Sequence, residues 1–223
     1  MTGQAFVSGA YPADRAAALA GIPRRTLYYW AKTELVVPSV SRTKLKRWSY
    51  ADLLILRLVD WLRHEKPQLE MPGTSMRRIR QTLARVEDFG DHLLADGFEV
   101  YVDRAGTLIF EGLAGLHIPL GEGVAQGLLD TKVDLVRPFE VNPGLRGPDL
   151  VRPRPALRIV PGKLSGEPHV DATRIPTTTL AALADRGFEP AVIAEMYPPI
   201  TPASVAEAID LEVQLAENSR VAA

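Results

Sequence analysis

The stretch ADRAAALAGIPRRTLYYWAK at residues 13–32 constrains the fold more strongly than any other part of the sequence. Its alanine-rich first half favours a helix, and Gly21 and Pro23 interrupt that helix before a second one over 24–32. Residues 35–49 then predict a loop or a short β-wing. The chain therefore begins with the order helix, tight turn, helix, wing.

Two further helices complete this first unit. Ser49 stands at the position of an N-cap for a helix over 50–64, whose many leucines form a broad apolar face. Apolar side chains at helical spacing predict a fourth helix over 75–87. We expect residues 1–88 to form one helical domain with a small wing.

The middle of the chain changes character. Residues 89–141 contain β-rich segments with a hairpin turn at 104–106, followed by a glycine-rich stretch, and they predict a small central sheet. Residues 142–156 are rich in glycine, proline and arginine, which predicts an extended linker.

The C-terminal region, residues 157–223, contains three short helical patterns, over 178–186, 190–196 and 202–218. Gly187 is a natural stop for the first of them. The whole chain is therefore expected to be α+β but mainly α, with a winged helix-turn-helix, a small sheet and a three-helix domain.

Composition excludes several kinds of site and any membrane-spanning segment. The chain has no cysteine, so disulfide bonds, thiolate zinc sites and cysteine nucleophiles are ruled out. No window approaches the roughly 18 apolar residues of a membrane span, and the N-terminus lacks the pattern of a secretory signal. We expect a cytoplasmic protein that does not contact a membrane.

The net charge of −1 conceals an uneven distribution. Residues 24–85 contain 14 Lys and Arg against 5 Asp and Glu, whereas residues 86–223 contain 11 against 21. Such a split between the parts of a chain points to nucleic-acid contact on the basic side.

The second helix and the wing carry the residues that this contact would use. A helix-turn-helix places its second helix in the major groove, where side chains reach phosphates and base edges. The predicted DNA-binding residues are Arg24, Arg25, Thr26, Tyr28, Tyr29 and Lys32 on the second helix and Lys44, Lys46 and Arg47 on the wing. The alternative is a surface-charged helical bundle in which Tyr28, Tyr29 and Trp30 belong partly to the core.

Two motifs in this region resemble one family. IPRRTLYYW at 22–30 with LVVP at 35–38, and KRWSYADL at 46–53, resemble the winged helix-turn-helix of MerR-type regulators. The resemblance covers about residues 11–87. It implies DNA contacts by Arg25, Thr26 and Tyr29, and it places Lys46 at the position of the wing arginine and Trp48 between the wing and the third helix.

The chain also departs from that family. Tyr28, Trp30 and Glu34 stand where the family has an arginine, a tyrosine and the turn glycine. The long dimerisation helix and the sensor cysteines of MerR proteins are missing. The DNA-binding part is therefore expected without the usual sensor.

The stretch GEPHVDATRIP at 166–176 first suggests an active site. His169 and Asp171 would share one face of a strand, but no nucleophile motif and no further metal ligands accompany them. We expect a lone surface histidine, a turn tied by the Thr173 hydroxyl, and Pro176 ahead of a helix. No catalytic, metal-binding or cofactor-binding residue is predicted.

The same stretch belongs to a longer pattern. The residues in register with this pattern are Gly166, Pro168, Thr173, Arg174, Ile175, Pro176, Gly187, Ile193, Tyr197, Pro198, Thr201 and Ala208. Because of these positions, the segment 157–215 resembles the C-terminal domain of VapB-type antitoxins, with Ala172 in place of the usual glycine. The resemblance implies a three-helix, homeodomain-like fold. Residues 166–223 hold three Lys and Arg against nine Asp and Glu, so we expect protein contact or dimerisation rather than DNA binding.

Together the two resemblances predict an antitoxin, not an enzyme, that represses its own operon at operator DNA and neutralises a PIN-domain ribonuclease toxin. An arginine from the linker can enter the acidic pocket of such a toxin, and the candidates are Arg146, Arg152 and Arg154. The alternative, which the sequence favours equally, is that these arginines only keep the linker soluble.

The alternative is a one-component MerR-like transcriptional regulator that senses a small ligand in the middle region. Operator DNA with two half-sites implies a homodimer in either case, or a toxin–antitoxin hetero-oligomer in the first.

Overall fold

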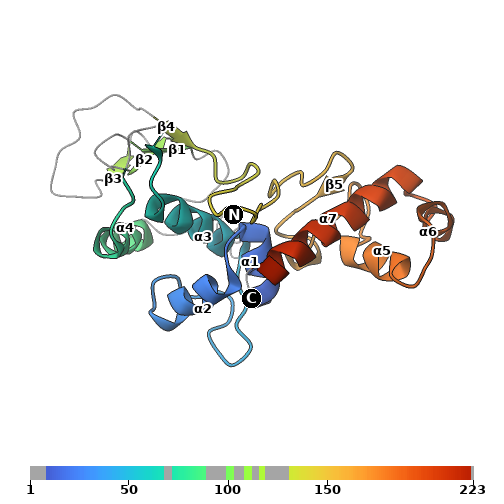
Figure 1. Ribbon diagram of the computed structural model, residues 1–223, viewed down its shortest axis with the longest axis horizontal. Coiled ribbons are helices and arrows are strands. Elements are labelled where there is room, and N and C mark those ends of the chain that lie inside the picture. The colour runs from blue at the N-terminus through green and yellow to red at the C-terminus, as the bar shows by residue number, and fades with distance from the viewer. Residues whose placement is uncertain are drawn as a thin grey trace.

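The computed structural model describes residues 9–67, 72–88, 99–102, 108–111, 116–118 and 131–221. The protein is mainly helical, with a small sheet at one end of an elongated molecule and three C-terminal helices at the other (Figure 1). The predicted hairpin turn at 104–106 and most of the glycine-rich stretch lie outside the described residues.

Helices α1 (Ala13–Ala20) and α2 (Arg24–Lys32) form the predicted helix-turn-helix. Helix α1 ends at Gly21, which adopts the left-handed conformation with φ 72°. A Cβ atom at Gly21 would lie 2.5 Å from the backbone nitrogen of Gly147. Glycine is therefore needed here both for the turn and for the close approach of a distant segment.

The wing connects α2 to α3 (Tyr50–Arg63). Ser41 and Arg47 exchange backbone hydrogen bonds of 3.2 and 3.0 Å across its hairpin, and the fully buried Trp48 pairs in the same way with Tyr11. The Ser49 side chain accepts a hydrogen bond from the Asp52 backbone, which confirms the predicted N-cap.

Helix α4 (Met76–Asp88) follows α3 and leads to a four-stranded antiparallel sheet. The strand order is β3-β2-β1-β4, so the chain's first two strands form the predicted hairpin and β4 pairs with β1. The strands are β1 (Glu99–Val102), β2 (Leu108–Glu111), β3 (Leu116–Ile118) and β4 (Thr131–Val133).

The C-terminal region contains a short ribbon and three helices. Strands β5 (Leu157–Arg158) and β6 (His169–Val170) pair antiparallel, with a 3₁₀ turn at Leu164–Gly166 between them. The helices are α5 (Thr177–Ala184), α6 (Pro190–Met196) and α7 (Pro202–Val221).

Helix α7 connects the C-terminal helices with α1 in the middle of the molecule. Its 20 residues span roughly 30 Å. It packs against α5 and α6 over one part of its length and against α1 over another, as Figure 1 shows. The buried Leu211 and Leu215 lie along this helix in the same core as the buried alanines of α1. The N-terminal and C-terminal helices therefore share one hydrophobic core.

The segment 142–156 has no helix or strand, but it is packed rather than extended into solvent. Leu145 and Leu150 are buried, and Gly147 pairs with Phe139. The side chain of Asp149 accepts hydrogen bonds from the backbone N–H groups of Val151 and Arg152, at 2.8 and 2.6 Å. Glycine and proline here permit close packing against the helices, so composition alone misrepresented the segment as a spacer.

Candidate nucleic-acid interface

Helix α2 has one buried and one exposed face. Leu27 and Trp30 face the core, whereas Tyr28 and Tyr29 are 41% and 59% exposed. Of the three aromatic residues that the alternative places partly in the core, Trp30 is buried, whereas Tyr28 and Tyr29 are exposed. Because the apolar residues are three positions apart, the cationic residues of the helix are directed to the opposite side.

The cationic residues of α2 differ in their surroundings. Arg25 and Lys32 are exposed and form no ion pair with any described residue. Arg24 donates to Asp14 of α1 at 2.6 Å and lies over the Tyr28 ring, 5.3 Å from its centroid. Thr26 is half-buried. Arg25 and Lys32 are therefore the two α2 cations most available to an external phosphate.

The wing presents its charge at the tip of a short hairpin. Lys44 and Leu45 are exposed, and Lys46 and Arg47 are half-buried. Arg47 donates to the Lys46 carbonyl at 3.4 Å. The predicted wing residues thus lie together, with Lys44 the most accessible of the three cations.

Hydrogen bonds fix the base of the wing to α3. The Asp52 carboxylate accepts from the backbone of Ser39 at 3.0 Å and of Ser49 at 2.7 Å, and the Ser39 hydroxyl donates to it at 2.9 Å. Burial raises the pKa of Asp52, while these donors oppose that shift. The start of α3 therefore sets the position of the wing relative to α2.

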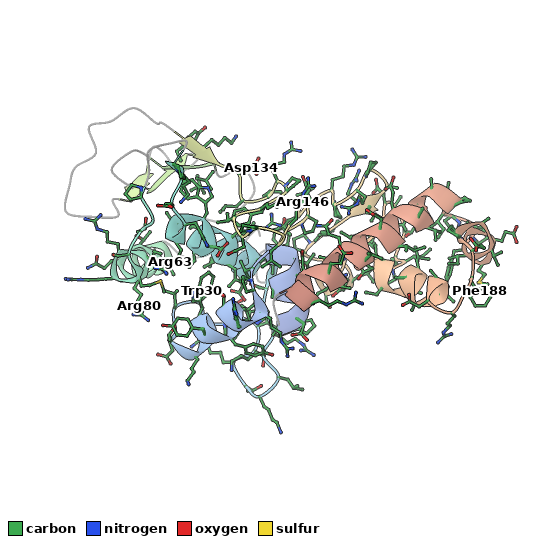
Figure 2. All side chains as sticks on the ribbon, in the orientation of Figure 1. Trp30, Arg63, Arg80, Asp134, Arg146 and Phe188 are labelled. Atoms are coloured by element: carbon green, nitrogen blue, oxygen red, sulfur yellow. The ribbon has the colours of Figure 1, made fainter. Side chains whose placement is uncertain are left out.

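Other exposed arginines extend this surface and were not singled out from the sequence. Arg42 lies at the wing tip, and Arg77, Arg78 and Arg80 lie on α4. Arg80 donates to the Thr33 carbonyl at 3.4 Å, which places α4 beside the end of α2 (Figure 2). Only the overall basic excess of residues 24–85 signals them in the sequence, because they belong to no local motif.

Comparison with known families agrees with this geometry. Residues 11–85 match the model of the MerR HTH family regulatory protein. The chain begins with a MerR-type domain. We call residues 11–85 the MerR-type head. Residues 158–210 match a second model, described as a protein of unknown function (DUF433).

Three curated relatives share part of the sequence with the chain. They are named uncharacterized HTH-type transcriptional regulators, one from Mycobacterium bovis and two from strains of Mycobacterium tuberculosis. Each is 31% identical over 119 residues, which cover 51% of this chain and 50% of the relative. The chain thus spans about half the length of the curated relatives it matches. No solved structure matches the chain.

A charged cluster docks the C-terminal region onto the MerR-type head. Arg15 of α1 binds the Glu212 carboxylate of α7 through two bonds of 2.6 and 2.8 Å and binds Glu167 at 2.9 Å. The side chains of Arg15 and Glu212 are only 12% and 14% exposed. Thr177 also donates to Glu212. Sequence inspection missed this cluster because its members are far apart in the chain.

Further hydrogen bonds seal the same contact. The Tyr11 hydroxyl donates to the Gly166 carbonyl at 2.8 Å, and burial raises the pKa of this tyrosine above its ordinary value. A Cβ atom at Gly166 would lie 2.1 Å from that hydroxyl. Asn218 of α7 donates to the Ala18 carbonyl at 3.1 Å. The first residue of the GEPHVDATRIP stretch is therefore glycine because the MerR-type head lies against it.

Arg57 ties the head to the middle of the chain. It is completely buried on α3 and donates to the carbonyls of Leu135, Arg137, Leu19 and Pro148 at 2.8, 2.9, 2.7 and 2.6 Å. Burial lowers its pKa to about 9, which leaves the guanidinium charged at pH 7. One side chain thus holds the end of α1 and two loop segments in place.

The three predicted toxin-binding arginines are not equivalent. Arg146 and Arg152 are exposed. Arg154 donates to Asp210 at 2.7 Å and to Gln214 at 2.7 Å, both on α7. Their proposed contact with a toxin stays a prediction, in which Arg154 is the least available of the three.

The prediction of a surface histidine in GEPHVDATRIP is wrong. His169 is buried and its Nδ1 lies 3.0 Å from the Glu167 carbonyl, because it belongs to strand β6 inside the docked region. Burial lowers its pKa. The Thr173 hydroxyl donates to the Val170 carbonyl at 2.8 Å, which confirms the predicted turn. Ala172 has φ 57°, the left-handed conformation that glycine adopts more readily than alanine.

Two further kinds of feature are absent from the described residues. No described helix is long and apolar enough to cross a membrane. Within the same residues, no group of three or more histidine or acidic side chains is placed to hold a metal ion.

Proposed function

We propose that the protein is a one-component transcriptional regulator that binds operator DNA through its MerR-type head and acts without catalysis. The observation that carries this proposal is the placement, on one side of the head, of exposed cations that form no ion pair with a described residue. Arg25 and Lys32 lie on the groove-entering helix, and Lys44 lies on the wing tip. Phosphate neutralisation by such residues supplies most of the affinity of a DNA-binding domain.

The proposal includes a homodimer that reads two half-sites in the cytoplasm. A single helix-turn-helix contacts only a few base pairs, and dimers gain specificity from the fixed spacing of two copies. The sequence predicts that the long pairing helix of MerR proteins is missing, and the residues after Asp88 that would form it lie outside the described part of the chain.

Selection of binding sites from a random double-stranded DNA library tests this function. We expect enrichment of an inverted repeat with half-sites about one helical turn apart, and binding that weakens steeply as salt is raised. Sedimentation of the protein with the selected DNA measures the stoichiometry. Enrichment of no sequence, together with no salt-dependent binding, would refute the proposal.

A second candidate function is neutralisation of a PIN-domain toxin by the region after the head. It is supported by the resemblance of residues 157–215 to VapB-type antitoxins and by the exposure of Arg146 and Arg152. A toxin with an acidic metal-binding pocket attracts such side chains.

Co-expression with the adjacent open reading frame distinguishes the two functions. An antitoxin restores growth and co-purifies with the neighbour's product, and the double variant Arg146→Ala/Arg152→Ala weakens both effects. Arg186→Ala, at an exposed position after α5, is the matched control. A harmless neighbour that does not co-purify removes the antitoxin function and leaves the regulator proposal intact.

A further inference from the structure

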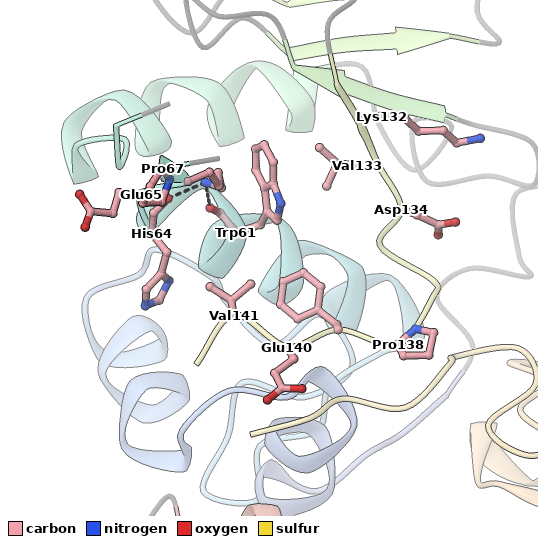
Figure 3. A pocket seen from close by; sticks show the side chains of 12 residues that line it. Trp61, His64, Glu65, Pro67, Lys132, Val133, Asp134, Pro138, Glu140 and Val141 are labelled. Atoms are coloured by element: carbon pink, nitrogen blue, oxygen red, sulfur yellow. Dashed lines mark hydrogen bonds between the residues drawn. The ribbon is translucent and has the colours of Figure 1, made fainter. Parts of the chain in front are cut away.

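A cavity of about 610 Å³ lies between the end of α3 and the segment 132–141. One wall comes from residues 61–67, at the end of α3 and just beyond it, and the other comes from β4 and the residues after it. Its volume falls within the range of roughly 300–1,000 Å³ that small-molecule sites occupy. Figure 3 shows the pocket and the side chains that line it.

The interior of the pocket is apolar and aromatic. Trp61, Phe139, Val133 and Val141 line it. Figure 3 shows Trp61 in the middle of this group, with the side chains of Lys132 and Asp134 directed away from it. Indole and phenyl rings bind flat aromatic groups through stacking and edge contacts, in addition to the burial of apolar area.

The buried charges beside the pocket already have partners. Lys66 donates to the carbonyls of Trp61 and His64, the latter at 2.6 Å, and its ammonium lies 3.8 Å from the centroid of the Trp61 ring. Asp60 accepts a hydrogen bond of 2.8 Å from Asn142. The charged lining residues are of both signs, with Lys66 and Lys132 against Glu65, Asp134 and Glu140. No cluster of one sign faces the pocket, so its charge favours neither an anion nor a cation over a neutral ligand.

We propose that this pocket binds an uncharged aromatic small molecule of one or two fused rings. Binding itself does not depend on the proposed regulator function, but its use as an effector site rests on that function. The site lies at the junction of the MerR-type head and the middle region.

One helix connects the pocket to the DNA-binding surface. The start of α3 holds the wing through Asp52, and its end carries Trp61 in the pocket, about 14 Å from Asp52 along the helix. Between them Arg57 binds the carbonyl of Leu19 at the end of α1 and that of Leu135 after β4. A ligand that displaces the segment 132–141 therefore acts on the residues that position α1 and α3.

Binding is tested on the full chain without DNA, with three bicyclic probes of different charge. They are neutral 2-naphthol, anionic 2-naphthoate and cationic N-methylquinolinium. The readout is the indole N–H signal of Trp61 in two-dimensional NMR, assigned with Trp61→Phe, while Trp30 and Trp48 are buried elsewhere and serve as internal references. We expect 2-naphthol to shift the Trp61 signal selectively and to bind more tightly than either charged probe.

Two variants locate the site, and titration calorimetry measures their affinity for 2-naphthol because Trp61→Leu has no Trp61 signal. Val141→Phe fills the cavity and should weaken 2-naphthol at least tenfold, as should Trp61→Leu, which removes the ring. Val151→Phe introduces the same substitution as Val141→Phe at an exposed position outside the pocket, and it should leave the affinity for 2-naphthol unaltered. Thermal unfolding of each variant shows whether the fold is retained, and the probe comparison on the natural protein stands if one variant does not fold.

Three results would overturn the proposal: no shift of Trp61 at millimolar 2-naphthol, equal affinity in Val141→Phe when that variant is folded, or tighter binding of a charged probe. DNA affinity with and without 2-naphthol is measured separately. If the probe binds but no DNA does, the regulator function fails and the aromatic site remains.

Discussion

Two faces of the MerR-type head use positive charge in different ways. On the face formed by α2 and the wing tip, Arg25, Lys32 and Lys44 are exposed and form no ion pair within the described part of the chain. On the face that contacts the C-terminal region, Arg15 of α1 is enclosed by the carboxylates of Glu167 and Glu212. Unpaired cations are available to a partner outside the chain, whereas paired and buried ones hold the chain together.

The difference separates residues whose loss should affect binding from those whose loss should affect folding. An exposed ion pair contributes little because water and salt screen it, but breaking a buried one leaves an uncompensated charge. Arginine counts along the sequence do not distinguish the two roles. The four predictions that follow test this separation.

The largest effect is expected at Arg57. Arg57→Met leaves the buried carbonyls of Leu19, Leu135 and Pro148 without their donor and should lower the free energy of unfolding by about 3–5 kcal/mol. Urea unfolding followed by circular dichroism measures it. Arg63→Met, at an exposed position of the same helix, is the control and should change stability by less than about 0.5 kcal/mol. Equal stabilities of the two variants would contradict the structural role of Arg57.

A somewhat smaller loss is expected at the docking contact. Arg15→Met leaves Glu167 and Glu212 close together and partly buried, which should reduce stability by about 3 kcal/mol. Adding Glu212→Gln should recover part of the loss. Arg24→Met breaks a pair whose side chains are 48% and 57% exposed, so a much smaller loss than that of Arg15→Met is expected. Similar losses in Arg15→Met and Arg24→Met would mean that burial does not distinguish the two pairs.

The exposed face should behave in the opposite way. Arg25→Ala and Lys44→Ala should leave the unfolding curve unchanged while each weakens DNA binding by about 1–2 kcal/mol and lowers the slope of log affinity against log salt by about 1. Fluorescence anisotropy with the selected operator at several salt concentrations measures both quantities. Arg186→Ala, exposed at the far end of the molecule, controls for a general loss of positive charge. An unchanged salt slope would show that these cations do not contact phosphates.

The smallest effect concerns Asp60, beside the aromatic pocket. Burial raises the pKa of Asp60 to about 6 from its ordinary value of 3.8, against the opposing influence of His64. The folded protein therefore keeps a proton between pH 4 and 6 that the unfolded chain loses, so stability falls as pH rises through this window. Asp60→Asn should remove that fall, so the stability of the variant relative to the natural protein should rise between pH 4 and pH 7. Urea unfolding at both pH values measures the change, and a constant difference would contradict it.

Local features of the fold were predictable from the sequence. The turn at Gly21, the Ser49 cap and the helix α6 follow from short-range rules, because each depends on residues within one or two turns of each other. The exposed cations of α2 were predictable for the same reason, since helical spacing separates them from Leu27 and Trp30.

Long-range packing could not be predicted in this way. No residue near Arg57 in the sequence indicates that it binds carbonyls from three other segments. The partners of Arg15, Glu167 and Glu212, are likewise far from it in the sequence. The burial of His169 and of segment 142–156 follows from the same docking. Charge and composition indicate which residues are polar, but only the tertiary contacts show which of them are enclosed.

The packing of α7 on α1 also has a consequence for the order in which the protein is made. The Asn218 side chain and the Ala18 carbonyl that it binds are 200 residues apart. A ribosome therefore releases α1 long before the helix that covers it. During synthesis the small apolar surface of α1 remains uncovered, and the nascent chain needs protection from its neighbours until the last helix emerges.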